Sequence, residues 1–331
     1  MDEKGKWKEL LQRMIAAEAS DLHAAPGQCV RIRRDGALVS DTFVPSASFM
    51  DALLGEMISE DRCAILPGHD VDFSWTYAGR RFRGNAYHME NGIGLALRLL
   101  PARIMTPDEI DMPDALRSIA AVRDGLVLVC GPTGAGKTTT LASLIEVINQ
   151  TRRVHIITLE DPIEYIFLPA SAFISQRELG RDFSSFPDAV RSALREDPDI
   201  LLAGEIRDRA TMEAALMAAA TGILVLGTLH TRSAAQAAMR VESMFPADVR
   251  DAVRAQFADA VTGIFAQRLL PRVGGGRAAA FEVLRAVPAV RNIVRNGQYS
   301  QLSSVMMSGA EQGMQTSEMA EAMLRSKGII V

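Results

Sequence analysis

The segment Gly-Pro-Thr-Gly-Ala-Gly-Lys-Thr at residues 131–138 decides the fold of this chain. It satisfies the pattern Gly-x-x-x-x-Gly-Lys-Ser/Thr, in which glycines let backbone N–H groups turn inward around phosphates. Residues 126–130 before it are uniformly apolar and predict a buried parallel strand, while residues 138–149 after it have helical spacing. A strand, this loop and a helix in that order predict a site for a nucleoside triphosphate.

The chemistry expected of the loop follows from its side chains. Lys137 supplies a mobile positive charge for the outer phosphates, and the Thr138 hydroxyl is a suitable ligand for Mg²⁺. An ordinary glycine-rich turn with a surface lysine is the competing interpretation, but it does not explain why glycines, lysine and hydroxyl coincide. The expected nucleotide-binding residues are Gly131, Pro132, Thr133, Gly134, Ala135, Gly136, Lys137, Thr138 and Thr139.

The bulk composition is that of an ordinary globular protein. The chain has 331 residues, which favours two domains, with 48% hydrophobic and 23% charged residues. Its net charge of -4 gives no overall basic field for nucleic acid. The first ten residues lack the apolar core of a signal peptide, and no apolar run is long enough for a membrane span, so we expect a cytoplasmic protein. Cys29, Cys63 and Cys130 stand apart, which indicates neither a disulfide framework nor a zinc site.

The first hundred residues predict a small α+β domain. A helix is expected at residues 7–19, with strands at 29–33, 72–77, 81–87 and 94–99. Arg34-Asp35-Gly36 and Ala78-Gly79 are turn signals that favour antiparallel pairing. The proline-containing stretch after residue 100 has the composition of a linker. We therefore expect a domain at 1–100, a linker at 101–115 and a second domain at 116–331.

The second domain alternates strands with helical patterns. The expected strands are residues 126–130, 154–159, 200–203 and 223–229. This rhythm predicts an α/β fold with a parallel sheet covered on both faces, in which ligands bind at the carboxyl ends of the strands. Gly274 to Gly276 predict a hairpin tip, and the chain from residue 290 onward reads as a helical tail.

Three groups of polar residues follow expected strands and would meet at that edge. Glu160, Asp161 and Glu164 come after the second strand, and carboxylates there would hold magnesium or orient water; a solvated acidic loop is the alternative. Glu205 follows residues 200–203, in the manner of a strand that delivers a carboxylate to a metal. His230 follows residues 223–229, where it would contact a terminal phosphate or serve a structural purpose.

Arginines are the expected partners of transferred phosphate charge. Arg191 and Arg195 are four residues apart and would share one helix face. Arg83 and Arg98 belong to the first domain and would reach a nucleotide only across a cleft between domains or subunits. From the residues alone, solvated surface positions are the favoured interpretation for all four.

From Ser20-Asp21-Leu22-His23 to Lys327-Gly328-Ile329, these motifs resemble the type II/type IV secretion (GspE/PilT) ATPase superfamily, and most closely its PilT-like pilus retraction subfamily. The resemblance implies a PAS-like first domain and a RecA-like P-loop NTPase second domain. It also implies ATP and Mg²⁺ as cofactors, a cytoplasmic homohexamer, and peripheral attachment to the inner membrane through a pilus platform protein. A paralogous pilus ATPase is a further implied partner.

The resemblance also assigns roles by position. Residues 131–138 match the Walker A loop, 160–164 the Asp box, 200–205 the Walker B strand, and His230 the second histidine of the His box. Glu164 is then the candidate for activating water and Glu205 for holding Mg²⁺, directly or through water, although the two acids could exchange roles. Arg83, Arg98, Arg191 and Arg195 match phosphate-facing arginines, from the same or a neighbouring subunit.

Two further features bear on the subfamily. Ala-Val-Arg-Asn-Ile-Val-Arg at residues 289–295 resembles the signature of retraction motors, and the chain carries neither the four-cysteine segment nor the long leading extension of extension and secretion relatives. Ile223 stands where the family has its first His-box histidine, and isoleucine neither donates a hydrogen bond nor titrates. Pilus retraction is therefore the expected function. Pilus extension, type II secretion and a weakly hydrolysing accessory subunit remain the alternatives, while a kinase is disfavoured because no acceptor site is apparent.

Overall fold

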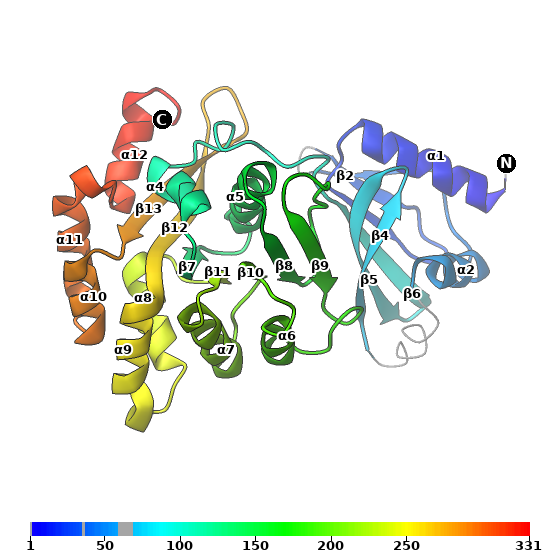
Figure 1. Ribbon diagram of the computed structural model, residues 1–331. Coiled ribbons are helices and arrows are strands. Elements are labelled where there is room, and N and C mark those ends of the chain that lie inside the picture. Colours follow the sequence, from blue (N-terminus) through cyan, green and yellow to red (C-terminus); the bar gives the residue numbers. More distant parts are fainter. Residues whose placement is uncertain (1, 35–36, 59–68) are drawn as a thin grey trace. The chain divides into compact units, whose positions relative to one another are not determined.

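The computed structural model describes residues 2–34, 37–58 and 69–331, and it separates into two compact units, Met1–Arg103 and Ile104–Val331 (Figure 1). The boundary falls within the segment that was expected to be a linker. The assignment of the first unit to a PAS-like domain stays a prediction. The turn predicted at Arg34 extends over residues 35–36, which lie outside the described residues.

The first unit is built around an antiparallel sheet with the strand order β3-β2-β1-β6-β5-β4 among its described residues. Its elements are α1 (Glu3–Ala16), β1 (Asp21–Ala24), β2 (Arg31–Arg34), β3 (Ala37–Ser40), α2 (Ala47–Met57), β4 (Val71–Tyr77), β5 (Arg80–Met89) and β6 (Gly92–Leu99). The turn predicted at Ala78-Gly79 joins β4 to β5, and both residues have positive φ, of 49° and 74°. This geometry suits a tight hairpin turn.

Two helices supply the core of the first unit. Trp7, Leu10 and Met14 of α1 pack in one buried cluster with α2 and with strand residues that include Phe82. The predicted start of α1 at residue 7 is wrong, because the polar turn before it is helical too. The Asp2 side chain accepts a hydrogen bond from Gly5 N and so satisfies an amide that has no partner within the helix.

The second unit is a seven-stranded sheet in the order β13-β12-β7-β11-β10-β8-β9. Every neighbouring pair is parallel except β12 and β13. The strands are β7 (Gly125–Cys130), β8 (His155–Glu160), β9 (Phe173–Glu178), β10 (Ile200–Ala203), β11 (Leu224–Leu229), β12 (Val261–Pro271) and β13 (Arg277–Arg285). The helices and 3-10 turns are α4 (Asp114–Arg117), η1 (Ser118–Ala121), α5 (Lys137–Thr151), α6 (Phe186–Ala193), α7 (Arg209–Ala220), α8 (Ala234–Ser243), η2 (Ala247–Val249), α9 (Arg250–Ala260), α10 (Pro288–Arg295), η3 (Tyr299–Gln301), α11 (Leu302–Ser308), η4 (Ala310–Gln312) and α12 (Ser317–Ser326).

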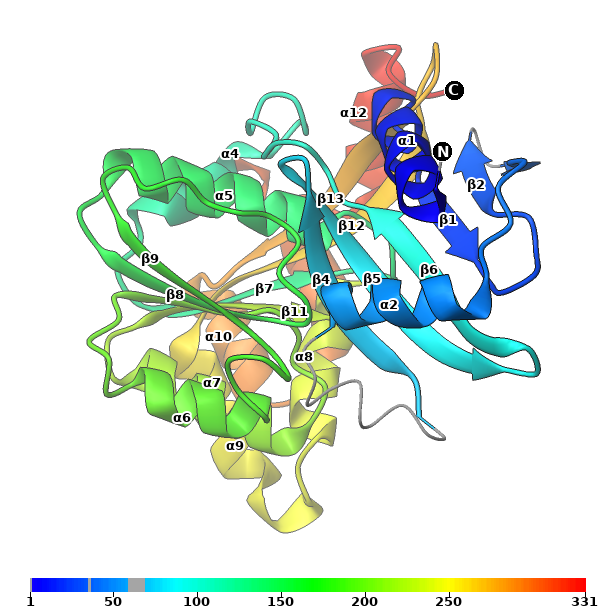
Figure 2. The same cartoon turned by 90° about the vertical axis from the view of Figure 1, so that its right-hand side faces the viewer.

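Both faces of this sheet are covered, as the apolar strands predict. Alternate residues of β7 enter different clusters: Leu126 and Leu128 pack with α6 and α7, whereas Val127 and Val129 pack with α5. Figures 1 and 2 show α5 on one face of the sheet and α6 and α7 on the other. The expected α/β fold with a parallel-rich sheet is confirmed, and β7, β11, β10 and β8 bring their carboxyl ends to one edge.

Some elements differ from the sequence-based expectation. The strand β9 and the helix α2 were not expected from the sequence. The predicted hairpin tip is confirmed: Gly274, Gly275 and Gly276 lie between β12 and β13 and have positive φ. Residue 223, expected to begin a strand, lies just before β11 and is buried.

Candidate functional site

The loop between β7 and α5 has the shape of a phosphate cradle. Gly131, Gly134 and Gly136 have φ values of 153°, 76° and 87°, a region that favours glycine. A Cβ at Gly131 would lie 2.4 Å from the carbonyl oxygen of Gln267 on β12, so a side chain there would collide with backbone. The loop amides and the start of α5 therefore fit a phosphate chain.

Lys137 is folded back over this loop. Its Nζ donates to the carbonyl oxygens of Gly131, at 2.7 Å, and Pro132, at 3.1 Å. Burial lowers the pKa of Lys137, while the negative charges of Glu205 and Glu164 act in the opposite direction. The phosphate-loop lysine thus lies within electrostatic reach of both carboxylates that the sequence singles out.

Glu205 lies just beyond β10, between two basic side chains. One carboxylate oxygen is 2.7 Å from His230 Nε2, and the other accepts a 2.6 Å hydrogen bond from Arg207. Burial by itself raises the pKa of Glu205, but the hydrogen bond and charge of Arg207, with the contribution of His230, lower it overall. The structure therefore brings Glu205 and His230 into contact just beyond the carboxyl ends of the neighbouring strands β10 and β11.

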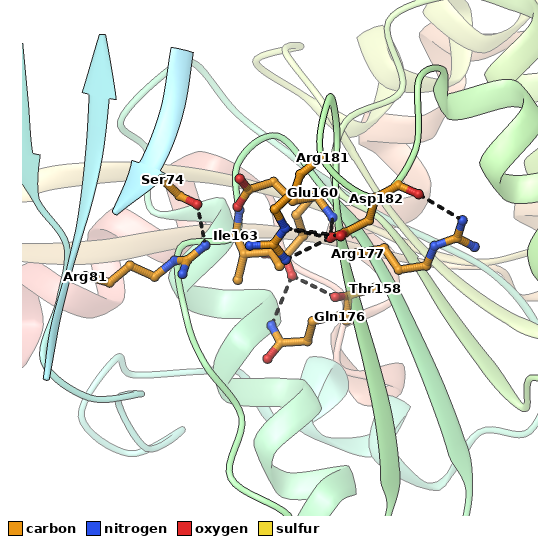
Figure 3. A network of polar contacts seen from close by, with 10 residues as sticks. Ser74, Arg81, Thr158, Glu160, Ile163, Gln176, Arg177, Arg181 and Asp182 are labelled. Carbon is orange, nitrogen blue, oxygen red and sulfur yellow. Dashed lines mark hydrogen bonds and ion pairs between the residues drawn. The ribbon is translucent and has the colours of Figure 1, made fainter. Parts of the chain in front are cut away.

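The acids at the end of β8 and in the loop after it, Glu160, Asp161 and Glu164, have distinct surroundings. Glu160 is buried, and its Oε1 accepts hydrogen bonds from Thr158 Oγ1 (2.7 Å) and Gln176 Nε2 (3.3 Å), as Figure 3 shows. Burial raises the pKa of Glu160 to about 7, against the effect of those two hydrogen bonds. Asp161 approaches Arg207 at 3.9 Å. Glu160 is therefore an interior residue. Glu164 differs from it, because its negative charge raises the pKa of Lys137 on the phosphate loop.

The four candidate arginines are placed differently. Arg83 and Arg98 are cross-strand partners on β5 and β6, and each approaches a separate acid: Asp72 at 3.8 Å and Asp21 at 2.8 Å. Both belong to the first unit, so their role toward phosphate stays a prediction.

On the second unit, Arg191 donates to Asp188 at 3.2 Å. Arg195 lies in the turn after α6, which ends at Ala193. The prediction that Arg191 and Arg195 share one helix face is wrong, because the helix stops before the second of them.

Several polar residues at the site were missed by sequence reasoning. Gln267 Oε1 accepts a 2.8 Å hydrogen bond from Thr140 of α5, and the Tyr165 hydroxyl lies 2.9 Å from Thr139 Oγ1. Arg207 was missed as well, although it stands only two residues after Glu205. The sequence signal for Gln267 is a polar residue directly after the apolar residues 264–266, and the structure shows that this glutamine is buried.

The donor set fits a nucleotide with magnesium. Among the described residues, no three His, Cys, Asp or Glu side chains are grouped as a metal site. Magnesium in phosphate-loop proteins takes only one or two protein ligands, with phosphate and water oxygens completing its shell. The Thr138 hydroxyl at the start of α5 and the charged Glu205 carboxylate are of the type that such an ion accepts.

Across the part of the chain that the structure describes, every helix is too short or too polar to span a bilayer.

Comparison with known proteins agrees with this geometry. The family described as "Type II/IV secretion system protein" matches residues 6–297. The type IV pilus retractation ATPase PilT of Pseudomonas aeruginosa is 40% identical over 325 residues, 97% of this chain and 94% of that protein. The type IV pilus ATPase PilU of the same organism is 36% identical over 98% of this chain and 86% of its own length.

A solved structure supports the same relationship. The crystal structure of the pilus retraction motor PilT with bound ADP superposes with a TM-score of 0.90 at 40% identity, covering 98% of this chain and 94% of that one. The phosphate loop, the two acids and the extent of these matches lead to one conclusion: the chain belongs to the type II/IV secretion system protein family.

Proposed function

We propose that this chain is a magnesium-dependent ATPase motor that drives type IV pilus retraction. The observation that carries the proposal is the phosphate loop after β7 at the same edge of the sheet as Glu205, which follows β10, and Glu164, which follows β8. The charges of both acids act on Lys137 and raise its pKa against the effect of burial. A loop for phosphates next to two acids of separate origin suits phosphoryl transfer to water. The likeness to PilT over nearly the whole chain supports retraction as the work performed.

Each residue then has a defined task. The amides of residues 131–136 and the Lys137 ammonium bind the phosphates and stabilise the charge that develops during transfer. Glu164 orients and deprotonates the attacking water. Thr138 and Glu205, the latter directly or through water, would hold a magnesium ion, and that ion would neutralise phosphate charge. His230 and Arg207 keep Glu205 ionised and in place.

The assembly belongs to the same proposal. A homohexamer in the cytoplasm, attached to the inner membrane through a platform protein, would place Arg83, Arg98, Arg191 and Arg195 near phosphates within or between subunits. Movement of one unit against the other would convert hydrolysis into removal of pilin. A second pilus ATPase is a candidate partner, since Pseudomonas aeruginosa has both PilT and PilU.

Steady-state hydrolysis of Mg-ATP by the purified chain tests the enzymatic part. Turnover that is lost in Lys137→Ala, while the oligomer is retained, is the expected result, because the loop would lack its charge for the outer phosphates. Equal turnover in both proteins would contradict the assignment. Deletion of the gene tests the direction of force: surface pili that persist but no longer retract support retraction, and loss of pili supports extension.

The accessory-subunit alternative rests on Ile223. The residue is buried in the apolar cluster beneath the sheet and cannot replace a histidine in hydrogen bonding. Nucleotide binding without turnover by the purified chain would favour that alternative. Turnover by the chain alone would exclude it.

A further inference from the structure

The loop that carries Glu164 is held by the edge strand β9. Gln176 and Glu178 are two residues apart on β9 and so point to the same face of the sheet. In the parallel register they lie opposite Thr158 and Glu160 of β8. These two polar side chains are thus placed beside the start of the acidic loop.

Their contacts reach the backbone on both sides of Glu164. The amide N–H of Ile163, the residue before it, donates to Glu178 Oε2 at 3.2 Å. Gln176 Nε2 donates to the carbonyl oxygen of Tyr165, the residue after it, at 2.8 Å.

Gln176 makes two more contacts. Its Oε1 accepts from the amide N–H of Phe167 at 3.0 Å, and its Nε2 also donates to Glu160. One side-chain amide therefore joins two backbone groups of the loop to a buried carboxyl. Figure 3 shows the contact between Gln176 and Glu160.

The carboxyl end of β9, beside the acidic loop, has contacts of its own. Asp182 accepts from the amide N–H of Glu178 at 2.8 Å and pairs with Arg181 at the same distance. The hydrogen bond from Arg181 is the largest of the effects that hold the pKa of Asp182 below its usual range. A strand that is anchored in this way is a rigid support for the loop beside it.

We propose that Gln176 and Glu178 are positioning residues that fix the Glu164 carboxylate relative to the phosphate loop. This inference rests on the proposed role of Glu164 in hydrolysis. Neither side chain touches the reacting atoms; each acts through the peptide groups next to Glu164. Orientation of a catalytic group is worth large factors in rate, since a displacement of about 1 Å costs roughly 100-fold.

The test measures Mg-ATP hydrolysis and ADP binding by the full-length chain carrying Gln176→Leu. We expect kcat to fall by about 10- to 100-fold while the Kd for ADP stays within about threefold, because the phosphate loop is untouched. Arg177→Gln is the matched control. Arg177 lies between the two positioning residues on the opposite face of β9, where it pairs with Glu196 at 2.9 Å and donates to the backbone carbonyl oxygen of Asp182 at 3.4 Å. Neither contact involves the Asp182 carboxylate that accepts from Glu178, so this replacement should leave kcat within about twofold of wild type.

A double-mutant cycle separates positioning from general structural damage. If Gln176 acts through Glu164, then Gln176→Leu lowers kcat in the wild-type background but causes no further loss in Glu164→Gln. An equal fractional loss in both backgrounds would overturn the proposal. So would a kcat within twofold of wild type for Gln176→Leu, when the kcat of Glu164→Gln is strongly reduced but still measurable. Full turnover in Glu164→Gln would instead show that the proposed role of Glu164 is wrong.

Glu178 provides a second pair should Gln176→Leu fail to fold. Glu178→Gln keeps an oxygen that accepts from Ile163 N, whereas Glu178→Leu removes it. Higher kcat in Glu178→Gln than in Glu178→Leu, by at least about fivefold at equal ADP affinity, is the expected result. Equal kcat in the two variants would overturn the proposal.

Discussion

The ends of β8 and β10 hold two glutamates in opposite electrostatic settings. The strands are parallel neighbours, so Glu160 and Glu205 approach the same edge of the sheet. Glu160 is buried among uncharged donors and its pKa is raised to about 7, whereas the pKa of Glu205 is lowered overall by Arg207 and His230, despite burial. The pKa of a carboxylate at this edge is therefore set by its burial and by the side chains beside it, and not by the strand that carries it.

Glu205→Gln should have the largest effect, because it removes the acid that is charged at the phosphate site. We expect turnover of Mg-ATP to fall about 1,000-fold, or about 4 kcal/mol of transition-state stabilisation. Steady-state hydrolysis measures the loss, and retained ADP binding is the control for folding. Turnover within tenfold of wild type would remove the contrast with Glu160.

Glu160→Gln should act on stability and in a pH-dependent manner. Between about pH 4.5 and 7 the unfolded chain loses the Glu160 proton while the folded chain keeps it, so wild-type stability falls as pH rises through this window. Glutamine does not titrate, so the free energy of unfolding of the variant should not fall in this window. The difference in this free energy between variant and wild type should therefore rise by up to about 3 kcal/mol from pH 4.5 to pH 8. Thermal unfolding at both pH values measures this. A difference in Tm that is the same at both would contradict the raised pKa.

Ile223→Val tests the edge of the sheet at the amino ends of the parallel strands, opposite the edge that carries Glu160 and Glu205. At this edge we expect the substitution to change apolar packing and no charged group. Ile223 is buried, and the loss of one methylene should lower the free energy of unfolding by about 1 kcal/mol. Hydrolysis should stay within about twofold of wild type, because the residue lies at the amino end of β11 and not near its carboxyl end. A fall in turnover beyond tenfold at unchanged stability would mean that this edge also takes part in catalysis.

Arg207→Gln should have the smallest effect, since the arginine side chain is 65% exposed and its ion pair with Glu205 is screened by solvent. Removing it raises the pKa of Glu205, so activity should decline at a higher pH than in wild type as the solution is acidified. We expect about a threefold loss on the acidic limb of the pH profile, or about 0.7 kcal/mol, and almost none at pH 8.5. A pH–rate profile measures the shift, and an identical acidic limb would show that His230 alone keeps Glu205 ionised.

The parts of the molecule that follow from local pattern were predictable. The apolar strand residues 200–203 and the glycines of the phosphate loop are dictated by neighbours in sequence, and β10 and α5 appear where the pattern places them. The fold class followed from the alternation of such segments.

Other features depend on tertiary contacts and had no local signal. The strand β9 ends with four polar residues, Ser175, Gln176, Arg177 and Glu178, a run typical of a loop. It is a strand nevertheless, because Glu178 bonds to Ile163 of the acidic loop and to Asp182 in the turn after β9. The separate surroundings of Glu160 and Glu164 were equally hidden, since the donors to Glu160 include a residue 16 positions away.

The contact between Gln267 and the phosphate loop has a consequence for folding order. Thr140 and Gln267 are 127 positions apart, and Gln267 also lies beneath Gly131. During synthesis the phosphate loop emerges long before β12. The strand β12 pairs with β7 and places Gln267 against the loop. Capture of nucleotide in the final geometry must therefore wait until residues 261–271 have been made and placed. ADP binding therefore indicates a nearly complete chain. A nascent chain that ends before Val261 lacks β12 and its contacts with the phosphate loop.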